Sequence, residues 1–358
     1  MDYCWYCGKM FSSVDFALGI KETNHFMTNS FREMVTYMGQ AAVSFEDARD
    51  ILMKLKGIEM AASQIQVVTE ETGASVFAAD LEESGDIFRE PEKHMSFALE
   101  KDKASDILYI LMDGSAVNTR VQDENGGTWK EMKLGMAFRS KDVIKRGTKL
   151  ESCTITNKEY VTYFGEVGKF KELIFAAAVR AGYGRVKNVV VIGDGAHWIW
   201  NLCDECFPDA VRILDYYHMA ENVHEYAGAL YPNDEKKKIE WAKSMTWYIK
   251  TDQYNKAIKI LSNNSLKPEV VEKTVNLLGY LENNKDRVRY LQYEQNGFYI
   301  GSGMIEGGNK VVIQKRMKQC GMRWSVNGGQ YIAALRAKNV SKKWNVVQDL
   351  INNRRKAS

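Results

Sequence analysis

Strand and helix patterns follow one another in a definite order between Ser105 and about Ala220, and this order limits the possible folds. Three strand patterns come first: DILYILMDGSAV, GTWKEMKLGMAFR and ESCTITNKEYVTYFG. The last two alternate apolar and polar residues, which indicates an antiparallel part of a sheet. An amphipathic helix pattern follows, and then a strand, a short helix and the strand pattern AVRILDYYH. The order predicts an α/β fold with a mixed five-stranded sheet and flanking helices.

Two aspartates lie at or near the ends of apolar strand patterns in this region. The run Val189–Ile192 leads into Gly-Asp-Gly, which predicts a strand buried on both faces with Asp194 at its carboxyl end. Open α/β sheets bind their ligands at the carboxyl ends of their strands. The first strand pattern is likewise expected to end at Asp113–Gly114. One acid on the first strand and another on the fourth, in this strand order, indicate an RNase H-like core.

Residues 29–100 carry helical patterns. Ser44 opens a capping-box pattern, and the helix that follows it should end at Gly57. A second helix is expected from about Ala61 to Gly73, which gives helix-turn-helix geometry. Because this second helix carries two glutamates and no basic residue, packing or dimer contact explains it better than base recognition.

The rest of the chain divides by composition. An all-helical insertion is expected where strand patterns are missing, and a final segment returns to glycine-rich sequence in which Glu306 opens or enters a helix. The predicted segments are a partial zinc-ribbon-like segment at 1–28, a small helical region at 29–100, the first part of the RNase H-like core at 101–220, the insertion at 221–297, the final part of the core at 298–344 and a basic tail at 345–358.

Cysteine pairs occur at two places. Cys4 and Cys7 have the spacing of one zinc knuckle, but a tetrahedral Zn²⁺ site needs four ligands and His25 is the only other ligand within reach. Zinc binding and metal-free thiols therefore both remain open for this pair. Cys203 and Cys206 have the same spacing on a predicted helix without a second pair, and free thiols are expected there.

The net charge of +3 conceals an asymmetry. Residues 301–358 hold twelve Lys and Arg against two acids, so this segment carries +10 and the remaining 300 residues carry −7. A basic end predicts a polyanionic partner, with DNA the first candidate. For Arg354–Lys356 alone, a solvated tail is the better explanation. No apolar stretch approaches the roughly 18 residues that cross a bilayer, and no secretory pattern opens the chain, so a cytoplasmic, nucleoid-associated protein without a membrane partner is expected.

Glu306 is a third acid in a comparable setting, because small residues flank it as they flank Asp113 and Asp194. Three carboxylates suit hard divalent cations such as Mg²⁺ or Mn²⁺, which prefer oxygen ligands. Two such ions about 4 Å apart stabilise both the attacking and the leaving oxygen of a phosphodiester. The three acids are therefore predicted to form one metal site.

Several stretches of the chain resemble the DDE transposases of bacterial insertion sequences. They are MDGSAV, GDGAHWIW, ILDYYHMAENV and GSGMIEGGNKVVIQKRMKQCGMRWS, with ALRAKNVSKKW after them. The resemblance runs from about Ser105 to Trp344 and points to the Mutator-like group and its ISKra-type family. Members of that family begin with a fuller cysteine-rich segment, whereas this chain has only Cys4 and Cys7 there.

The resemblance implies a function and a set of catalytic residues. Asp113, Asp194 and Glu306 would be the catalytic triad, binding Mg²⁺ for hydrolysis and strand transfer at the element ends and at target DNA. Asp215–His218 would be the Asp-x-x-His motif of the Mutator-like group, in which His218 contacts substrate or is simply hydrogen-bonded. A homo-oligomer on DNA is expected by analogy, because two element ends must be held together.

Cations in the same segment as Glu306 are the candidates for phosphate contact. Tryptophan faces can stack on an unpaired base, although Trp198 and Trp324, which lie beside glycine turns, are more often core residues. The predicted nucleic-acid-binding residues are Lys310, Lys315, Arg316, Lys318, Arg323 and Trp324.

Two other functions remain open. The stretches MDGSAV and VVVIGDGA also resemble motifs of haloacid dehalogenase-like phosphatases, but the position of that family's nucleophile is Leu111, which cannot attack phosphorus. An inactive or domesticated transposase that only binds DNA would keep the same fold. Metal-dependent strand cleavage separates this last alternative from an active enzyme.

Overall fold

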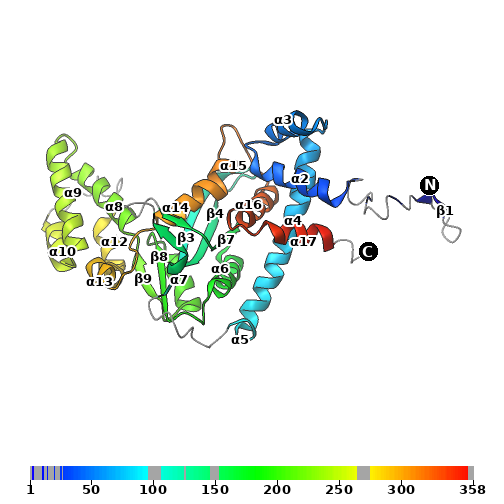
Figure 1. Ribbon diagram of the computed structural model, residues 1–358. Coiled ribbons are helices and arrows are strands. Elements are labelled where there is room, and N and C mark those ends of the chain that lie inside the picture. The colour runs from blue at the N-terminus through cyan, green and yellow to red at the C-terminus, as the bar shows by residue number, and fades with distance from the viewer. Residues whose placement is uncertain are drawn as a thin grey trace.

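The structure is a computed structural model that describes residues 27–95, 106–124, 126–145, 153–263 and 275–353, with a few positions nearer the N-terminus. N-terminal helices, a central sheet with its covering helices, and a second helical group lie side by side (Figure 1). The predicted zinc ligands Cys4 and Cys7 and the predicted tail Arg354–Lys356 lie outside the described residues. Among the described helices, none combines the length and the apolar character that a membrane span needs.

Five strands form the central sheet, in the order β7-β4-β3-β8-β9. The β3–β4 and β4–β7 pairs are antiparallel, whereas β3–β8 and β8–β9 are parallel. This confirms the predicted mixed five-stranded sheet with flanking helices, and the strand order is compatible with an RNase H-like core. The strands are β3 (Ile107–Asn118), β4 (Trp129–Arg139), β7 (Lys158–Tyr163), β8 (Asn188–Gly193) and β9 (Val211–Leu214).

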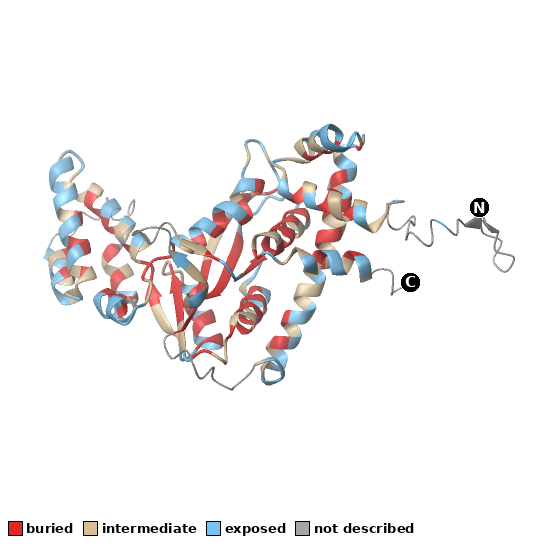
Figure 2. Ribbon diagram, in the orientation of Figure 1, coloured by how far each residue is buried: buried red, intermediate tan, exposed pale blue. Residues whose placement is uncertain are grey.

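Helices cover both faces of the sheet, which explains the uninterrupted apolar runs of its central strands. On one face α6 (Val167–Ala181) lies so close to β4 that a Cβ added at Gly135 would be 2.6 Å from a methyl carbon of Ile174. On the other face lies α14 (Gly303–Asn309). Figure 2 shows the buried residues concentrated in the sheet and in the helices that cover it.

Three predicted strands differ in extent from the observed ones. The first does not end at Asp113–Gly114, because β3 continues to Asn118 in antiparallel pairing with β4. The third strand pattern is divided, because β6 (Cys153–Ile155) pairs with β5 (Val143–Lys145) in a separate sheet and only β7 joins the main one. The fifth strand does not continue to His218. It ends at Leu214, because the Asp215 side chain accepts a 3.0 Å hydrogen bond from the Tyr217 backbone N–H and so begins α8 (Tyr216–Leu230).

The N-terminal helices confirm one predicted boundary and correct another. Ser44 Oγ accepts a 3.0 Å hydrogen bond from the Asp47 backbone N–H, and Gly57 ends that helix with a φ of 65°. The next helix does not end at Gly73, because a Cβ there would be 2.6 Å from the Tyr331 carbonyl oxygen and the glycine instead permits close helix packing. The helices are α2 (Asn29–Ala41), α3 (Phe45–Lys56), α4 (Ala62–Arg89) and α5 (Pro91–His94).

The described residues between β9 and α14 form helices and turns and contain no strand. This second helical group comprises α8, α9 (Glu235–Lys250), α10 (Tyr254–Asn263), α12 (Leu277–Asn283) and α13 (Tyr290–Gln295). After α14 come the π-helical turn η5 (Lys310–Gln314), α15 (Lys315–Met317), α16 (Val326–Val340) and α17 (Trp344–Asn353). The segment with Glu306 therefore returns to the sheet after a long helical excursion.

Candidate active site

The strand register places Asp113 and Asp194 side by side. Leu111 of β3 pairs with Ile192 of β8, and the two aspartates lie two residues further along these parallel neighbours. Adjacent strands are about 4.8 Å apart, and equivalent positions on them point to the same face of a sheet. The sheet thus brings the first two predicted acids together. Leu111 itself is fully buried, which matches its inability to act as a phosphatase nucleophile.

Asp113 lies in an environment that opposes its negative charge. Burial raises the pKa of its carboxyl group, and the negative charge of Asp194 adds to this. A hydrogen bond from Asn309 Nδ2 to Asp113 Oδ2, 2.7 Å long, and the nearby His218 act in the opposite direction. Asp113 therefore interacts electrostatically with both Asp194 and His218, and α14 contacts this group through Asn309.

Asp194 begins a tight turn between β8 and α7 (His197–Cys206). Its Oδ1 accepts a 2.9 Å hydrogen bond from the Ala196 backbone N–H, and Gly195 supports the turn with a φ of 105°. The Tyr280 hydroxyl of α12 donates a 2.8 Å hydrogen bond to the Asp194 carbonyl oxygen. The second helical group is thereby attached at the second acid.

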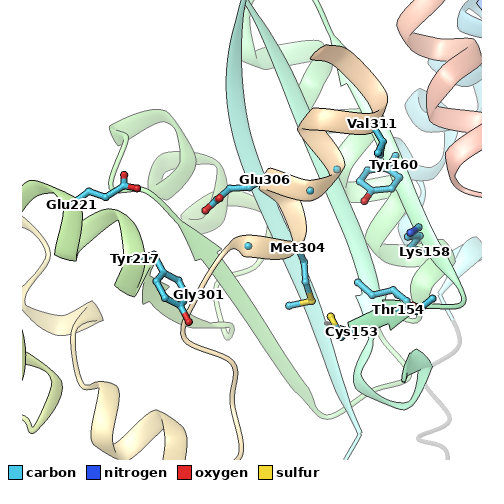
Figure 3. A pocket seen from close by; sticks show the side chains of 14 residues that line it. Cys153, Thr154, Lys158, Tyr160, Tyr217, Glu221, Gly301, Met304, Glu306 and Val311 are labelled. Carbon is cyan, nitrogen blue, oxygen red and sulfur yellow. The ribbon is translucent and has the colours of Figure 1, made fainter. Parts of the chain in front are cut away.

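Glu306 lies in the first turn of α14, as the sequence predicts. Its side chain extends from α14 toward α8 (Figure 3), and its Oε1 accepts a 3.4 Å hydrogen bond from Ser302 Oγ. Among the residues that the structure describes, no group of three His, Cys, Asp or Glu side chains is arranged to hold a metal ion. The structure thus brings two of the three predicted acids together and leaves the third on a facing helix.

Asp215 connects the end of β9 to the segment that carries Glu306. Its carboxylate is buried, and Oδ2 accepts a 2.5 Å hydrogen bond from Ser302 Oγ. Oδ1 accepts hydrogen bonds from the backbone N–H groups of Ser302, at 3.1 Å, and Tyr217, at 3.0 Å. The same serine hydroxyl thus lies between Asp215 and Glu306. Hydrogen bonds to a carboxylate are stronger than those between neutral groups, so this connection fixes the start of α14.

His218 lies in the first turn of α8 and is partly exposed. Its Nδ1 is 3.7 Å from Glu221 Oε2, and its ring meets the Tyr280 ring edge-on at a centroid distance of 6.5 Å. The imidazole also lowers the pKa of Asp113. These interactions place His218 near Asp113.

The structure separates the predicted DNA-contacting cations into two groups. Lys318 is exposed, and its positive charge interacts with Asp113 although partial burial lowers its pKa overall. It therefore lies near Asp113. The predicted contacts with exposed side chains are Lys310, Lys315, Lys318 and Arg323.

The predictions for Arg316 and Trp324 are wrong, because both side chains are buried. Arg316 is 1% exposed, and its guanidinium donates to the carbonyl oxygens of Gly39 and Val43 at 3.1–3.3 Å and packs on the rings of Phe45 and Trp324. Burial lowers the pKa of Arg316 to about 10. Trp324 is 4% exposed, and its Nε1 donates to the Met317 carbonyl oxygen. Both residues join the C-terminal segment to the N-terminal helices.

Residues flanking the predicted site include some that sequence reasoning did not select. Ser302 and Asn309 lie four residues before and three residues after Glu306, and nothing in their spacing distinguishes them from other small polar residues. Asp215 follows an apolar strand pattern, which is the signal that selected Asp194. Cys203 and Cys206 are buried on α7, and burial raises the pKa of both thiols, that of Cys206 to about 12.

Comparison with known proteins adds no family assignment to this geometry. No protein-family model matches the chain, and no curated protein matches its sequence. The function therefore has to be argued from the arrangement of the acids and from the motifs around them.

Proposed function

We propose that this chain is a DDE transposase with an RNase H-like core, which cleaves and joins phosphodiester bonds at the ends of an insertion sequence. The observation that carries the proposal is the proximity of Asp113 on β3 to Asp194 directly after the adjacent parallel strand β8, with α14 hydrogen-bonded to Asp113. The helical group between β9 and α14 is the insertion that separates the second acid from Glu306. DNA is the partner, and two element ends require more than one copy of the chain.

The donor atoms around Asp113 fit a hard divalent cation. Asp113, Asp194 and Glu306 supply carboxylate oxygens, which Mg²⁺ and Mn²⁺ prefer. Asn309 Oδ1 is a further oxygen, buried and without a hydrogen-bond partner among the described residues. A bound cation would also favour the ionised form of Asp113, which burial and Asp194 disfavour. When bound, the metal supplies stabilisation of the charge that develops on the phosphate oxygens.

Glu306 can join the aspartates by a change of side-chain conformation. It lies three residues before Asn309 on one helix, and residues at this spacing share a helix face. Asn309 already bonds Asp113, whereas the 3.4 Å contact between Glu306 and Ser302 is at the outer limit of a hydrogen bond. Little therefore opposes a turn of the Glu306 carboxylate toward Asp113.

The surrounding residues position DNA for in-line attack on a phosphodiester. The exposed cations Lys310, Lys315 and Arg323 bind the phosphate backbone near α14. Lys318, which interacts with Asp113, holds the phosphate near this carboxylate, and His218 contacts the substrate from α8. Water is the nucleophile for nicking, and the freed 3′-hydroxyl is the nucleophile for joining to target DNA.

Nicking of supercoiled plasmid in the presence of Mg²⁺ or Mn²⁺ tests this function without knowledge of the element ends. Asp113→Asn and Glu306→Gln should each reduce nicking by about 10³-fold or more, with DNA binding in a gel-shift assay largely unchanged. Asp349→Asn, an exposed acid on α17, is the matched control and should retain full activity. Nicking that persists in both site variants would contradict the assignment of Asp113, Asp194 and Glu306 as the catalytic triad. DNA binding without any nicking by the unaltered chain would instead favour the inactive DNA-binding alternative.

A further inference from the structure

A pocket of about 640 Å³ opens beside Glu306 and has no part in the catalytic steps above. Strands β6 and β7 form one wall, α8 forms another, and residues 301–311 form the floor (Figure 3). Tyr160 on β7 and Asp113 on β3 belong to the same face of the sheet, because Tyr160 pairs with Met136 and Asp113 with Leu134. The volume is that of a small-molecule site, roughly 300–1,000 Å³.

Two glycines of α14 enlarge this pocket without serving the packing of the protein. A Cβ added at Gly303 or Gly307 would meet no atom within 4 Å in the described part of the chain. By contrast, a Cβ at Gly308 would be 2.7 Å from the Tyr160 hydroxyl. Glycine is the least favourable helix residue after proline. Gly303 and Gly307 leave bare backbone and free space next to Glu306, where a ligand can approach closely.

Tyr160 presents its hydroxyl group to the pocket. Its side chain is only 6% exposed, and its hydroxyl makes no hydrogen bond with any residue that the structure describes. Figure 3 shows Tyr160 beside α14 with the hydroxyl on the pocket side. Burial raises its pKa, so the hydroxyl keeps its proton and remains a donor. A ligand with a hydrogen-bond acceptor at its edge could receive a hydrogen bond from this hydroxyl.

Tyr217 supplies a flat aromatic face at the rim. It is 45% exposed, and the hydrogen bond from its backbone N–H to Asp215 fixes its position at the start of α8. Gly301 lies directly against its ring, since an added Cβ there would be 2.5 Å from a ring carbon. Met304 and Val311 add apolar surface to the pocket lining. An aromatic face, apolar walls and a hydroxyl donor together suit a flat heteroaromatic ring.

The charges of the pocket favour a neutral group over a phosphate. Glu221 and Glu306 are both in the lining, and Lys158 is the single cation among the described lining residues. Burial lowers the pKa of Lys158, and its ammonium lies over the Tyr160 ring at 5.6 Å. A phosphate would therefore meet more negative than positive charge, whereas a nucleobase carries no charge at neutral pH.

We propose that this pocket holds a nucleobase turned out of the DNA strand whose phosphate lies at Asp113, Asp194 and Glu306. The proposal rests on the proposed function, because the shared residue Glu306 places the pocket next to the bond that is cut. The base stacks on Tyr217 and hydrogen-bonds to the Tyr160 hydroxyl, while its sugar passes over the bare backbone of Gly303 and Gly307. Turning out the base gives the enzyme access to the adjacent phosphodiester.

Binding of small probes to the full chain tests the pocket directly. Saturation-transfer NMR would compare deoxyadenosine 5′-monophosphate, thymidine 5′-monophosphate and deoxyribose 5-phosphate. Both nucleotides should bind at least about tenfold more tightly than the sugar phosphate, the effect of one stacked base. Equal binding of all three probes would show that the phosphate, and not the base, is recognised, and would overturn the proposal.

Filling the pocket locates the binding. Gly307→Leu should weaken nucleotide binding by at least about tenfold, whereas Gly168→Leu should leave it unchanged. Gly168 is the matched control because it is also an exposed helical glycine with no atom within 4 Å of an added Cβ among the described residues. If Gly307→Leu does not fold, Tyr217→Ala should show the same loss. Nucleotide binding that survives both substitutions would contradict the pocket assignment.

The plasmid assay keeps the two proposals apart. If nicking depends on Asp113 but nucleotide binding is not sensitive to Gly307→Leu, the proposed transposase function is kept and the base pocket is rejected. Nucleotide binding lost in Gly307→Leu, without any nicking by the unaltered chain, would retain the pocket and reject the catalytic function.

Discussion

The acids of the candidate site lie in two regions of contrasting construction. Asp113 lies on β3 and Asp194 directly follows β8, two strands whose side chains at Ile110, Leu111 and Ile192 are fully buried and whose backbones are bonded in register as far as Leu111 and Ile192. Glu306 belongs to α14, a helix of seven residues that contains two unpacked glycines and continues into a π-helical turn. The difference indicates a rigid pair of acids and an adjustable third.

Electrostatics explains why the third acid lies apart. Burial and the charge of Asp194 already raise the pKa of Asp113, so a third carboxylate beside them would be repelled. Glu306 instead lies with its Oε1 3.4 Å from Ser302 Oγ, whose hydroxyl is hydrogen-bonded to Asp215. A divalent cation removes this repulsion, and we therefore expect the site to be completed when the metal binds.

Replacing a glycine by a larger residue should change the free energy of unfolding very differently in the two regions, and this is the largest effect that we expect. Gly135→Val would place side-chain atoms within 2.6 Å of Ile174 and 2.9 Å of Val161, and we expect it to lower the free energy of unfolding by about 3 kcal/mol. Gly307→Ala in α14 should raise that free energy slightly, by at most about 1 kcal/mol. Urea unfolding of the two variants measures both effects. Equal losses of stability would show that α14 is as tightly packed as the sheet.

Removal of the serine hydroxyl should release Glu306 from its present position. Ser302→Ala leaves Asp215 Oδ2 without its 2.5 Å partner, and we expect kcat for plasmid nicking to fall about tenfold because Glu306 is misplaced. The metal concentration for half-maximal activity should rise, while the DNA affinity stays the same. Ser302→Thr keeps a hydroxyl and should restore most of the activity. A change in DNA affinity alone would mean that Ser302 contacts DNA and does not position Glu306.

Neutralising Asp113 should stabilise the metal-free protein. Its pKa is raised in the folded state, so its charge opposes folding above the pKa of the unfolded chain, and stability is lost as pH rises toward the folded value. Asp113→Asn should therefore increase the free energy of unfolding by about 1 kcal/mol at pH 8 and by much less at pH 4. The substitution also preserves an acceptor for Asn309 Nδ2.

Thermal unfolding at the two pH values, with and without Mg²⁺, measures this effect. Mg²⁺ should raise the melting temperature of the unaltered chain and leave that of Asp113→Asn almost unchanged. A variant that is less stable than the unaltered chain at pH 8 would show that the Asp113 charge is well compensated by its surroundings.

The sheet could be predicted from the sequence because local residue patterns determine its strands. An apolar run such as Val189–Ile192 has few alternatives to a buried strand, and the order of such runs predicted both the five-stranded sheet and the neighbouring positions of Asp113 and Asp194. The capping pattern at Ser44 likewise predicted a helix that the structure contains. These features depend on residues close together in the chain.

Features that depend on distant residues were not predictable in the same way. Arg316 is a basic residue of the kind that contacts DNA, yet its side chain is buried. It donates hydrogen bonds to carbonyl oxygens some 270 residues earlier in the chain. Gly73 resembles a helix end, but it serves the contact with Tyr331. The link between Asp215 and Ser302 spans 87 residues. In each case the sequence is compatible with two structural roles, and the tertiary packing determines which role the residue has.

The position of Glu306 in the metal-bound protein tests the central claim most directly. Crystals grown with Mn²⁺ and measured by anomalous diffraction should show the metal between Asp113 and Asp194, with a Glu306 carboxylate oxygen within about 2–2.5 Å of it. Asp113→Asn crystals should lack that signal. If Mn²⁺ binds the two aspartates while Glu306 still accepts its hydrogen bond from Ser302, or if no Mn²⁺ binds there, the three acids do not form one site.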